Sequence, residues 1–209
     1  MSLDLSDIAG WFPWITNEKL SAHQLFHVEL LRCNKKLNLV SPNTIQTLKE
    51  THFADCLGAV EFIKENEEIV DIGSGNGFPG IVLATILPAS MLYLVEVDGR
   101  KAEFWRHIVF KMKLQNARVV NKRIQDAGLG EKQAAVSRAF SSLRDSIDLA
   151  DKIFSPGFKY FHLKGDGWID EVGQVGSPLE KKWKVGLSGS YALPLSKVSR
   201  HVVLAEKIK

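Results

Sequence analysis

The residues best suited to chemistry form one glycine-rich run, Asp71–Gly80, which reads DIGSGNGFPG. Glycines at a turn between a strand and a helix permit positive φ and let the backbone approach a ligand. In a doubly wound sheet such a turn lies at the carboxyl ends of the strands, where ligands bind. The spacing of Gly75, Gly77 and Gly80 also matches the dinucleotide fingerprint, with Glu96 downstream as a ribose-binding acid. Two classes of cofactor therefore compete for this turn.

Asp71, which opens the run, separates the two cofactors. A carboxylate close to a helix N-terminus disfavours the pyrophosphate of a dinucleotide. S-adenosylmethionine instead carries an ammonium and a sulfonium group, which a carboxylate favours. The form D-x-G-x-G-x-G is typical of S-adenosylmethionine-dependent methyltransferases. We therefore predict that Asp71, Gly73, Gly75 and Gly77 bind S-adenosylmethionine, and keep an NAD(P)-binding oxidoreductase as the weaker alternative.

Two further segments complete the predicted cofactor site. Glu96 ends a predicted strand and can accept both ribose hydroxyls; Asp98 lies on the same face and stays an alternative. After the next strand comes the stretch Arg123–Asp126, where an adenine ring is usually held. Backbone groups there would contact the ring edge, while Gln125 or Asp126 accepts from the amino group.

The run Ser137–Phe140 ends the fourth predicted strand and supplies an arginine and an aromatic ring. Phe140 can stack on an unpaired base, although a core position is equally compatible with the sequence. The planar guanidinium of Arg138 suits the cofactor or a neighbouring RNA phosphate. His52 and Asp55 share a helix face, and we expect a structural hydrogen bond or a pocket wall there.

The elements that must position these residues change character near residue 67. Residues 1–66 show helical spacing, with helices expected at Glu18–Cys33, Thr44–Leu48 and Thr51–Lys64. The later segments alternate between strands and helices. Strands are expected at Ile69–Gly73, Met91–Val97, Ala117–Asn121, Ala134–Phe140 and Phe158–Lys164, helices at Ile81–Leu87 and Gly99–Leu114, and a final antiparallel pair at Lys182–Leu187 and His201–Glu206.

This alternation predicts an α/β, Rossmann-like fold with parallel βαβ units. Residues 1–66 would form a helical N-terminal cap, and residues 67–209 a cofactor-binding domain. The longest apolar stretch, Ile81–Leu87, is too short for a membrane span. A formal charge of +3 permits an RNA partner without requiring one. Cys33 and Cys56 are expected to be reduced thiols of a cytoplasmic protein without a metal site.

Six segments in this order resemble the glucose-inhibited division protein B family, the small-subunit rRNA guanine-N7 methyltransferases. They are Leu37–Ser41, His52–Asp55, Asp71–Gly80, Ser137–Phe140, Leu163–Gly165 and Arg200–Val203. The resemblance runs from about residue 20 to the end of the chain. It implies a helical cap on a seven-stranded methyltransferase sheet and action on the decoding region of 16S rRNA. Cys56, Asn76, Gln125 and Ser199 depart from the family's common residues.

The resemblance also implies which residues form the site. Cofactor contacts carry over to Gly73, Phe78, Ile124, Gln125 and Arg138. Independently of the resemblance, cationic side chains are candidates for contacts with RNA phosphates, although each taken singly fits a solvated surface charge better; they are Arg32, Lys35, Lys36, Lys164, Arg200 and Lys207.

Guanine N7 has a free lone pair, so no general base is expected. Arg138 and Phe140 would act by positioning. The expected partner is 16S rRNA or the small ribosomal subunit, bound by a monomer. A small-molecule methyltransferase is the alternative.

Overall fold

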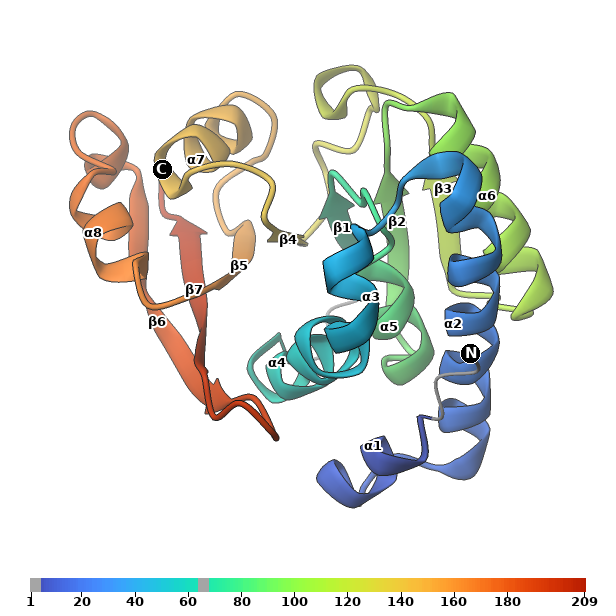
Figure 1. Ribbon diagram of the computed structural model, residues 1–209. Helices are drawn as coiled ribbons and strands as arrows, with labels where there is room; N and C mark the ends of the chain where they lie inside the picture. The colour runs from blue at the N-terminus through green and yellow to red at the C-terminus, as the bar shows by residue number, and fades with distance from the viewer. Residues whose placement is uncertain (1–4, 64–67) are drawn as a thin grey trace.

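The computed structural model describes residues 5–63 and 68–209, and within them one seven-stranded sheet has the order β3-β2-β1-β4-β5-β7-β6 (Figure 1). Strands β1 to β5 are parallel, and β7 is antiparallel to both β5 and β6. The strands are β1 (Glu68–Ile72), β2 (Met91–Val95), β3 (Ala117–Val120), β4 (Ala134–Arg138), β5 (Lys159–Lys164), β6 (Trp183–Ala192) and β7 (Ser199–Lys207). The predicted α/β fold class is confirmed.

Strand β1 lies at the point where the strand order reverses, because it pairs with β2 on one side and β4 on the other. Ligands of open α/β sheets bind at such a switch point. The glycine run follows β1 directly, and Arg138 ends β4. The topology therefore brings the two most distinctive sequence motifs together at the carboxyl ends of two neighbouring parallel strands.

Alternation along the strands divides the core between the two sheet faces. Ile69 and Leu92 pack with the N-terminal helices and with α5 (Gly80–Ile86) and α6 (Gly99–Lys111). Val70 and Tyr160 face the other way, toward α7 (Leu143–Asp151). The helices α7 and α8 (Trp168–Gly173) are absent from the sequence prediction. Helix α7 nevertheless carries the helical spacing Leu143, Ile147 and Ala150, all buried.

The N-terminal segment is helical, as predicted: α1 (Ser6–Trp11), α2 (Asn17–Leu37), α3 (Pro42–Leu48), the π-helical η1 (Lys49–Ala54) and α4 (Asp55–Ile63). Helix α2 runs four residues past the predicted end, to a left-handed Asn38 with φ 48°. The π-helical turn joins α3 to α4 and turns Phe53 and Ala54 into the core. The predicted cap boundary at residues 66 and 67, and the helix end at Lys64, lie outside the described residues.

The final strand pair is longer than predicted. The strands β6 and β7 extend past the predicted Lys182–Leu187 and His201–Glu206. Gly186, Gly189 and the register shift between Leu187 and Gly189 interrupt the alternation, which hides the full strand in the sequence. Among the described residues no helix has the length and apolar character to cross a membrane.

Candidate active site

The glycine turn after β1 adopts a backbone that other residues rarely reach. Gly73, Gly75 and Gly77 have φ values of 72°, 48° and 83°. A Cβ atom on Gly73 would lie 2.5 Å from the ring of Phe140, so neither the conformation nor the space admits a side chain there. The turn thus presents bare backbone at the switch point of the sheet.

Asp71 lies beneath this turn rather than on its surface. Its Oδ2 accepts a hydrogen bond of 3.1 Å from the backbone N–H of Gly80 at the start of α5. The residue is buried, and burial raises the pKa of its carboxyl to about 7. The structure therefore gives Asp71 a role in fixing the turn, and its direct contact with a cofactor stays a prediction.

Glu96 fixes the other side of the turn. Its Oε2 accepts from the backbone N–H of Gly75 at 3.0 Å, and its Oε1 accepts from that of Asp98 at 2.8 Å. Asp98 is engaged elsewhere, because its side chain caps α6 by accepting from the backbone N–H groups of Arg100 and Lys101. The geometry thus favours Glu96 over Asp98 as the acid that faces a ligand.

A first cavity of about 310 Å³ opens beside Glu96, within the usual range of roughly 300–1,000 Å³ for small-molecule sites. Gly73, Glu96, Ile124, Gln125 and Phe140 all line it. Its remaining walls are mainly apolar. These residues therefore meet in one place, although they follow the ends of four different strands, β1 to β4.

A second cavity, of about 620 Å³, borders the same end of β4. Ala139 lines this cavity and Phe140 lines the first, so the strand end lies between the two. Ala139 has φ 53°, a left-handed conformation that is uncommon for a residue with a side chain. Backbone strain of this kind concentrates at functional sites.

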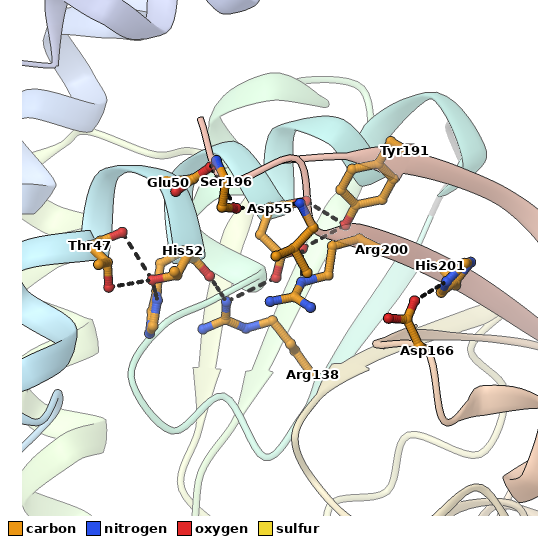
Figure 2. Close-up of polar contacts among 12 residues, drawn as sticks. Thr47, Glu50, His52, Asp55, Arg138, Asp166, Tyr191, Ser196, Arg200 and His201 are labelled. Carbon is orange, nitrogen blue, oxygen red and sulfur yellow. Dashed lines mark hydrogen bonds and ion pairs between the residues drawn. The ribbon is translucent and has the colours of Figure 1, made fainter. Parts of the chain in front are cut away.

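Asp55 organises the cations of the second cavity (Figure 2). Its Oδ2 lies 3.2 Å from Nη1 of Arg138, and its Oδ1 lies 3.5 Å from Nε of Arg200. The hydroxyl of Tyr191 donates to Oδ1 at 2.8 Å and to the backbone oxygen of Asp55 at 2.7 Å. One buried carboxylate from α4 thereby orients guanidinium groups from β4 and β7.

His52 forms part of the wall of this cavity. Its Nδ1 lies 3.1 Å from the hydroxyl of Thr51, and its Nε2 lies 2.9 Å from Nδ2 of Asn76. Burial, together with the nearby charge of Arg138, lowers the pKa of His52 to about 3. The ring is therefore neutral at physiological pH, and its hydrogen bonds agree with the structural role expected from the sequence.

The predicted RNA-contact residues fall into two groups. Arg200 and Lys164 line the second cavity, where Lys164 bonds to Glu171 Oε2 at 2.7 Å. Arg32 and Lys36 lie on α2 and are not among the residues that line it. Arg32 instead pairs with Glu29 at 2.6 Å.

Phe78, which is predicted to contact the cofactor, has a buried side chain. Its ring packs edge-on against His52 and Phe53, with centroids 5.0 and 4.9 Å away. The guanidinium of Arg138 lies over the same ring at 5.6 Å. Only the backbone of Phe78 remains suited to the predicted cofactor contact.

Comparison with known proteins gives the family. Residues 19–187 match the model of GidB, described as rRNA small subunit methyltransferase G. The chain belongs to this family. It is 34% identical to ribosomal RNA small subunit methyltransferase G 3 of Bdellovibrio bacteriovorus, over 96% of this chain and 93% of that protein. It is also 34% identical to ribosomal RNA small subunit methyltransferase G of Paracoccus denitrificans, over 76% and 80%.

Solved structures agree on the fold of this family member. A mutant of MtNAS in complex with S-adenosylmethionine superposes with a TM-score of 0.60 at 15% identity, covering all of this chain and 84% of that one. Precorrin-6y C5,15-methyltransferase from Geobacter metallireducens has a TM-score of 0.52 at 14% identity, covering 83% and 92%. At such identities the likeness concerns the fold alone.

The first cavity fits S-adenosylmethionine, the cofactor of this family. The bare backbone at Gly73 permits close approach of a ligand, and the buried carboxylate of Glu96 suits a ribose diol. Ile124 and Gln125 also line this cavity. The second cavity lies across the end of β4 from the first.

Sequence reasoning missed the residues that orient the arginines. Tyr191 stands 136 positions from Asp55, and Thr51 accepts from Arg138 Nη1 through its backbone oxygen at 2.8 Å. A local pattern does not signal a hydrogen bond between such distant segments. The bond from the Tyr191 hydroxyl to Asp55 becomes visible only once β6 is placed against α4.

Proposed function

We propose that this chain transfers the methyl group of S-adenosylmethionine to N7 of a guanine in 16S rRNA. The observation that carries the proposal is the pair of cavities that meet at the end of β4. One is lined by Gly73 and Glu96, and the other is lined by Arg138, Lys164 and Arg200. Family membership over nearly the whole chain supports the same conclusion.

The side chains around the second cavity suit a nucleophile that needs no activation. The lone pair of guanine N7 attacks a methyl group directly, and S-adenosylmethionine supplies that group in an electrophilic form. His52 is neutral and already hydrogen-bonded to Asn76. Cys56 is buried and its thiol pKa is strongly raised by burial, so it is no covalent nucleophile. Catalysis then rests on orientation, an effect worth up to roughly 7–11 kcal/mol.

Arg138 and Phe140 are the positioning residues in this proposal. A guanidinium bonded to O6 and N7 would occupy the attacking lone pair, so Arg138 does not read the guanine that way. Its bonds to Thr51 and Asp55 hold it against the cavity wall, where it can contact the cofactor or a phosphate. Phe140, 39% exposed, offers a ring to the splayed base.

We further propose that the protein acts as a monomer in the cytoplasm, on 16S rRNA or on the small subunit that contains it. Residues 1–66 serve as the cap and residues 67–209 as the cofactor-binding domain. The cap contributes Asp55 and His52 to the second cavity. It therefore forms part of the acceptor site as well as covering the sheet.

The test uses purified protein, labelled S-adenosylmethionine and small subunits from cells that lack the corresponding gene. Borohydride and aniline cleavage should reveal one new 7-methylguanosine in 16S rRNA. A panel of small methyl acceptors is the control for the alternative activity. Labelled RNA without 7-methylguanosine, or label in a small acceptor alone, contradicts the proposal.

A further inference from the structure

A surface outside the two cavities of the active site combines cations with an exposed aromatic ring. The described sheet ends at β3 on one side and β6 on the other, and β3 lies beside α6 at the right of Figure 1. A groove of about 480 Å³ lies between α6 and the start of β3. We call four of its lining residues the β3-edge surface: Arg106, Phe110, Lys113 and Arg118.

Phe110 is the aromatic residue of this surface. Its side chain is 83% exposed, the highest value among the large hydrophobic side chains of residues 5–63 and 68–209. Its neighbours Phe104 and Trp105 on the same helix are buried in the core. Single exposed apolar residues are common, so the exposure of Phe110 needs a second observation before it indicates a partner.

The charge around Phe110 supplies that observation. Residues 104–125 contain six Lys and Arg residues and no Asp or Glu, in a chain that has 24 acids among 209 residues. Arg118 donates to the backbone oxygens of Gln115 and Ala117, at 3.2 and 3.0 Å, which leaves its charge uncompensated. Arg106 pairs with Glu103 at the exposed surface, where such a pair is weak.

The same basic stretch continues to the active site. Lys122 and Arg123 follow β3 and line the first cavity, beside Glu96. Arg118 is the second residue of β3, and Lys122 follows it by four positions, about 13 Å of extended chain. Cations therefore follow the sheet edge from the groove to the cofactor cavity. A negatively charged chain that enters the active site can follow this edge.

We propose that the β3-edge surface binds an unpaired stretch of the substrate rRNA. Phe110 stacks on a base, and Arg106, Lys113 and Arg118 contact the adjacent phosphates. An aromatic ring among cations is the usual platform for single-stranded nucleic acid. This proposal rests on the proposed function, because it takes RNA as the substrate. The surface adds affinity for RNA and takes no part in the methyl transfer.

The test measures the binding of a fluorescein-labelled single-stranded RNA of 20 nucleotides, and of its duplex, by fluorescence anisotropy. The full chain carries Phe110→Ala, Phe110→Trp or the pair Lys113→Ala and Arg118→Ala. The matched control is Leu187→Ala with Lys184→Ala, an exposed apolar residue and a cation on β6 at the opposite sheet edge.

Phe110→Ala should weaken single-strand binding about tenfold, and Phe110→Trp should restore it, because every base stacks on an aromatic face. Lys113→Ala and Arg118→Ala together should make the slope of the log association constant against log salt concentration less steep by about 1.4. The β6 control should match the wild type. The affinity for S-adenosylmethionine should be the same in every variant.

Wild-type affinity in Phe110→Ala, or an equal loss for the duplex, overturns the proposal. Normal binding of naked rRNA with weakened binding of small subunits also overturns it, because the partner is then a ribosomal protein. Failure of the proposed function is separate: the wild type then forms no 7-methylguanosine. A wild type that methylates, with an unchanged KM for RNA in Phe110→Ala, refutes only the β3-edge proposal.

Discussion

Asp55 and Arg138 stand 83 residues apart in the chain, yet their side chains meet at 3.2 Å and join α4 to the end of β4. Asp55 also lies against Arg200 and receives the hydroxyl of Tyr191. The cap and the sheet thus share one buried carboxylate. Its removal leaves two guanidinium groups without their common partner, which gives the first prediction.

Asp55→Ala should destabilise the protein by about 3–5 kcal/mol, because it strips a buried ion pair of one member. Urea denaturation measures the change in the free energy of unfolding. Asp148→Ala is the matched control, since its pair with Lys152 is exposed and should contribute at most about 1 kcal/mol. Equal effects of the two substitutions would refute this account of Asp55.

Arg138→Lys should keep the fold but weaken the binding of cofactor or RNA by about 1–3 kcal/mol. Nη1 of Arg138 makes both bonds, to Thr51 and to Asp55, which leaves Nη2 and Nε to contact a ligand in the plane of the guanidinium. A lysine has a single nitrogen and therefore no second, planar pair of donors for a ligand. Calorimetry with S-adenosylmethionine and anisotropy with RNA measure the two affinities separately. Unchanged affinities with a collapsed methylation rate would show that Arg138 acts on the transition state instead.

Gly75→Val should abolish S-adenosylmethionine binding, which we expect to be micromolar in the wild type, about 8 kcal/mol. Valine is strained at φ 48°, and a shifted backbone would break the bond from Gly75 to Glu96. Gly157→Val is the control, because that glycine has φ 92° and open space around it. Gly157→Val should lower the free energy of unfolding but leave the calorimetric affinity for S-adenosylmethionine unchanged. Tight binding of NADH by the wild type would reverse the cofactor assignment.

The stability of the protein should depend on pH through Asp71. Burial raises the pKa of Asp71 from its ordinary value of 3.8 to about 7, so the native state keeps a proton that the unfolded state has lost. The resulting stabilisation is complete below about pH 4 and disappears as pH rises through 7. Asp71→Asn removes this dependence, and its stability relative to the wild type should therefore increase between pH 4 and 7.

Urea denaturation at several pH values measures that difference. Asp151→Asn is the control of opposite sign, since the pKa of Asp151 is lowered to about 2 by Lys182 and Lys207. The stability contributed by Asp151 is present above about pH 4 and is lost below it. The free energy of unfolding of Asp151→Asn should therefore differ from that of the wild type by a constant amount between pH 4 and 7. If the difference in the free energy of unfolding between Asp71→Asn and the wild type does not change with pH, the pKa of the buried carboxyl is not raised.

The sequence was informative where the signal is local. The glycine turn, the strand that ends in Glu96 and the fourth strand all follow from short patterns, and the structure places them at one sheet edge. Helix α7 was missed although its apolar spacing is regular. The linkage of Asp55 to Tyr191 and Arg200 was not predictable, because it depends on how β6 and β7 return to α4. The burial of Phe78 was not predictable either, because its ring packs against Phe53, which the π-helical turn carries into the core.

Phe140 provides the last prediction, because its ring lies against Gly73 and lines the first cavity, next to Ala139 of the second. If it stacks on the target base, Phe140→Ala should raise the KM for RNA or lower kcat by a factor that corresponds to about 1–3 kcal/mol. Phe140→Tyr should restore most of the rate. A purely structural phenylalanine would cost about 3–5 kcal/mol of stability on truncation, but a ring that is 39% exposed should cost less.

The decisive measurements are steady-state methylation of small subunits and urea denaturation of the same variants. The affinity for S-adenosylmethionine should hold or rise in Phe140→Ala, because truncation clears the space beside Gly73. Phe104→Ala is the matched control, an aromatic residue buried on α6 away from both cavities. It should lose stability and keep the KM for RNA. If Phe140→Ala behaves like Phe104→Ala, the ring belongs to the core and another group must hold the guanine in line.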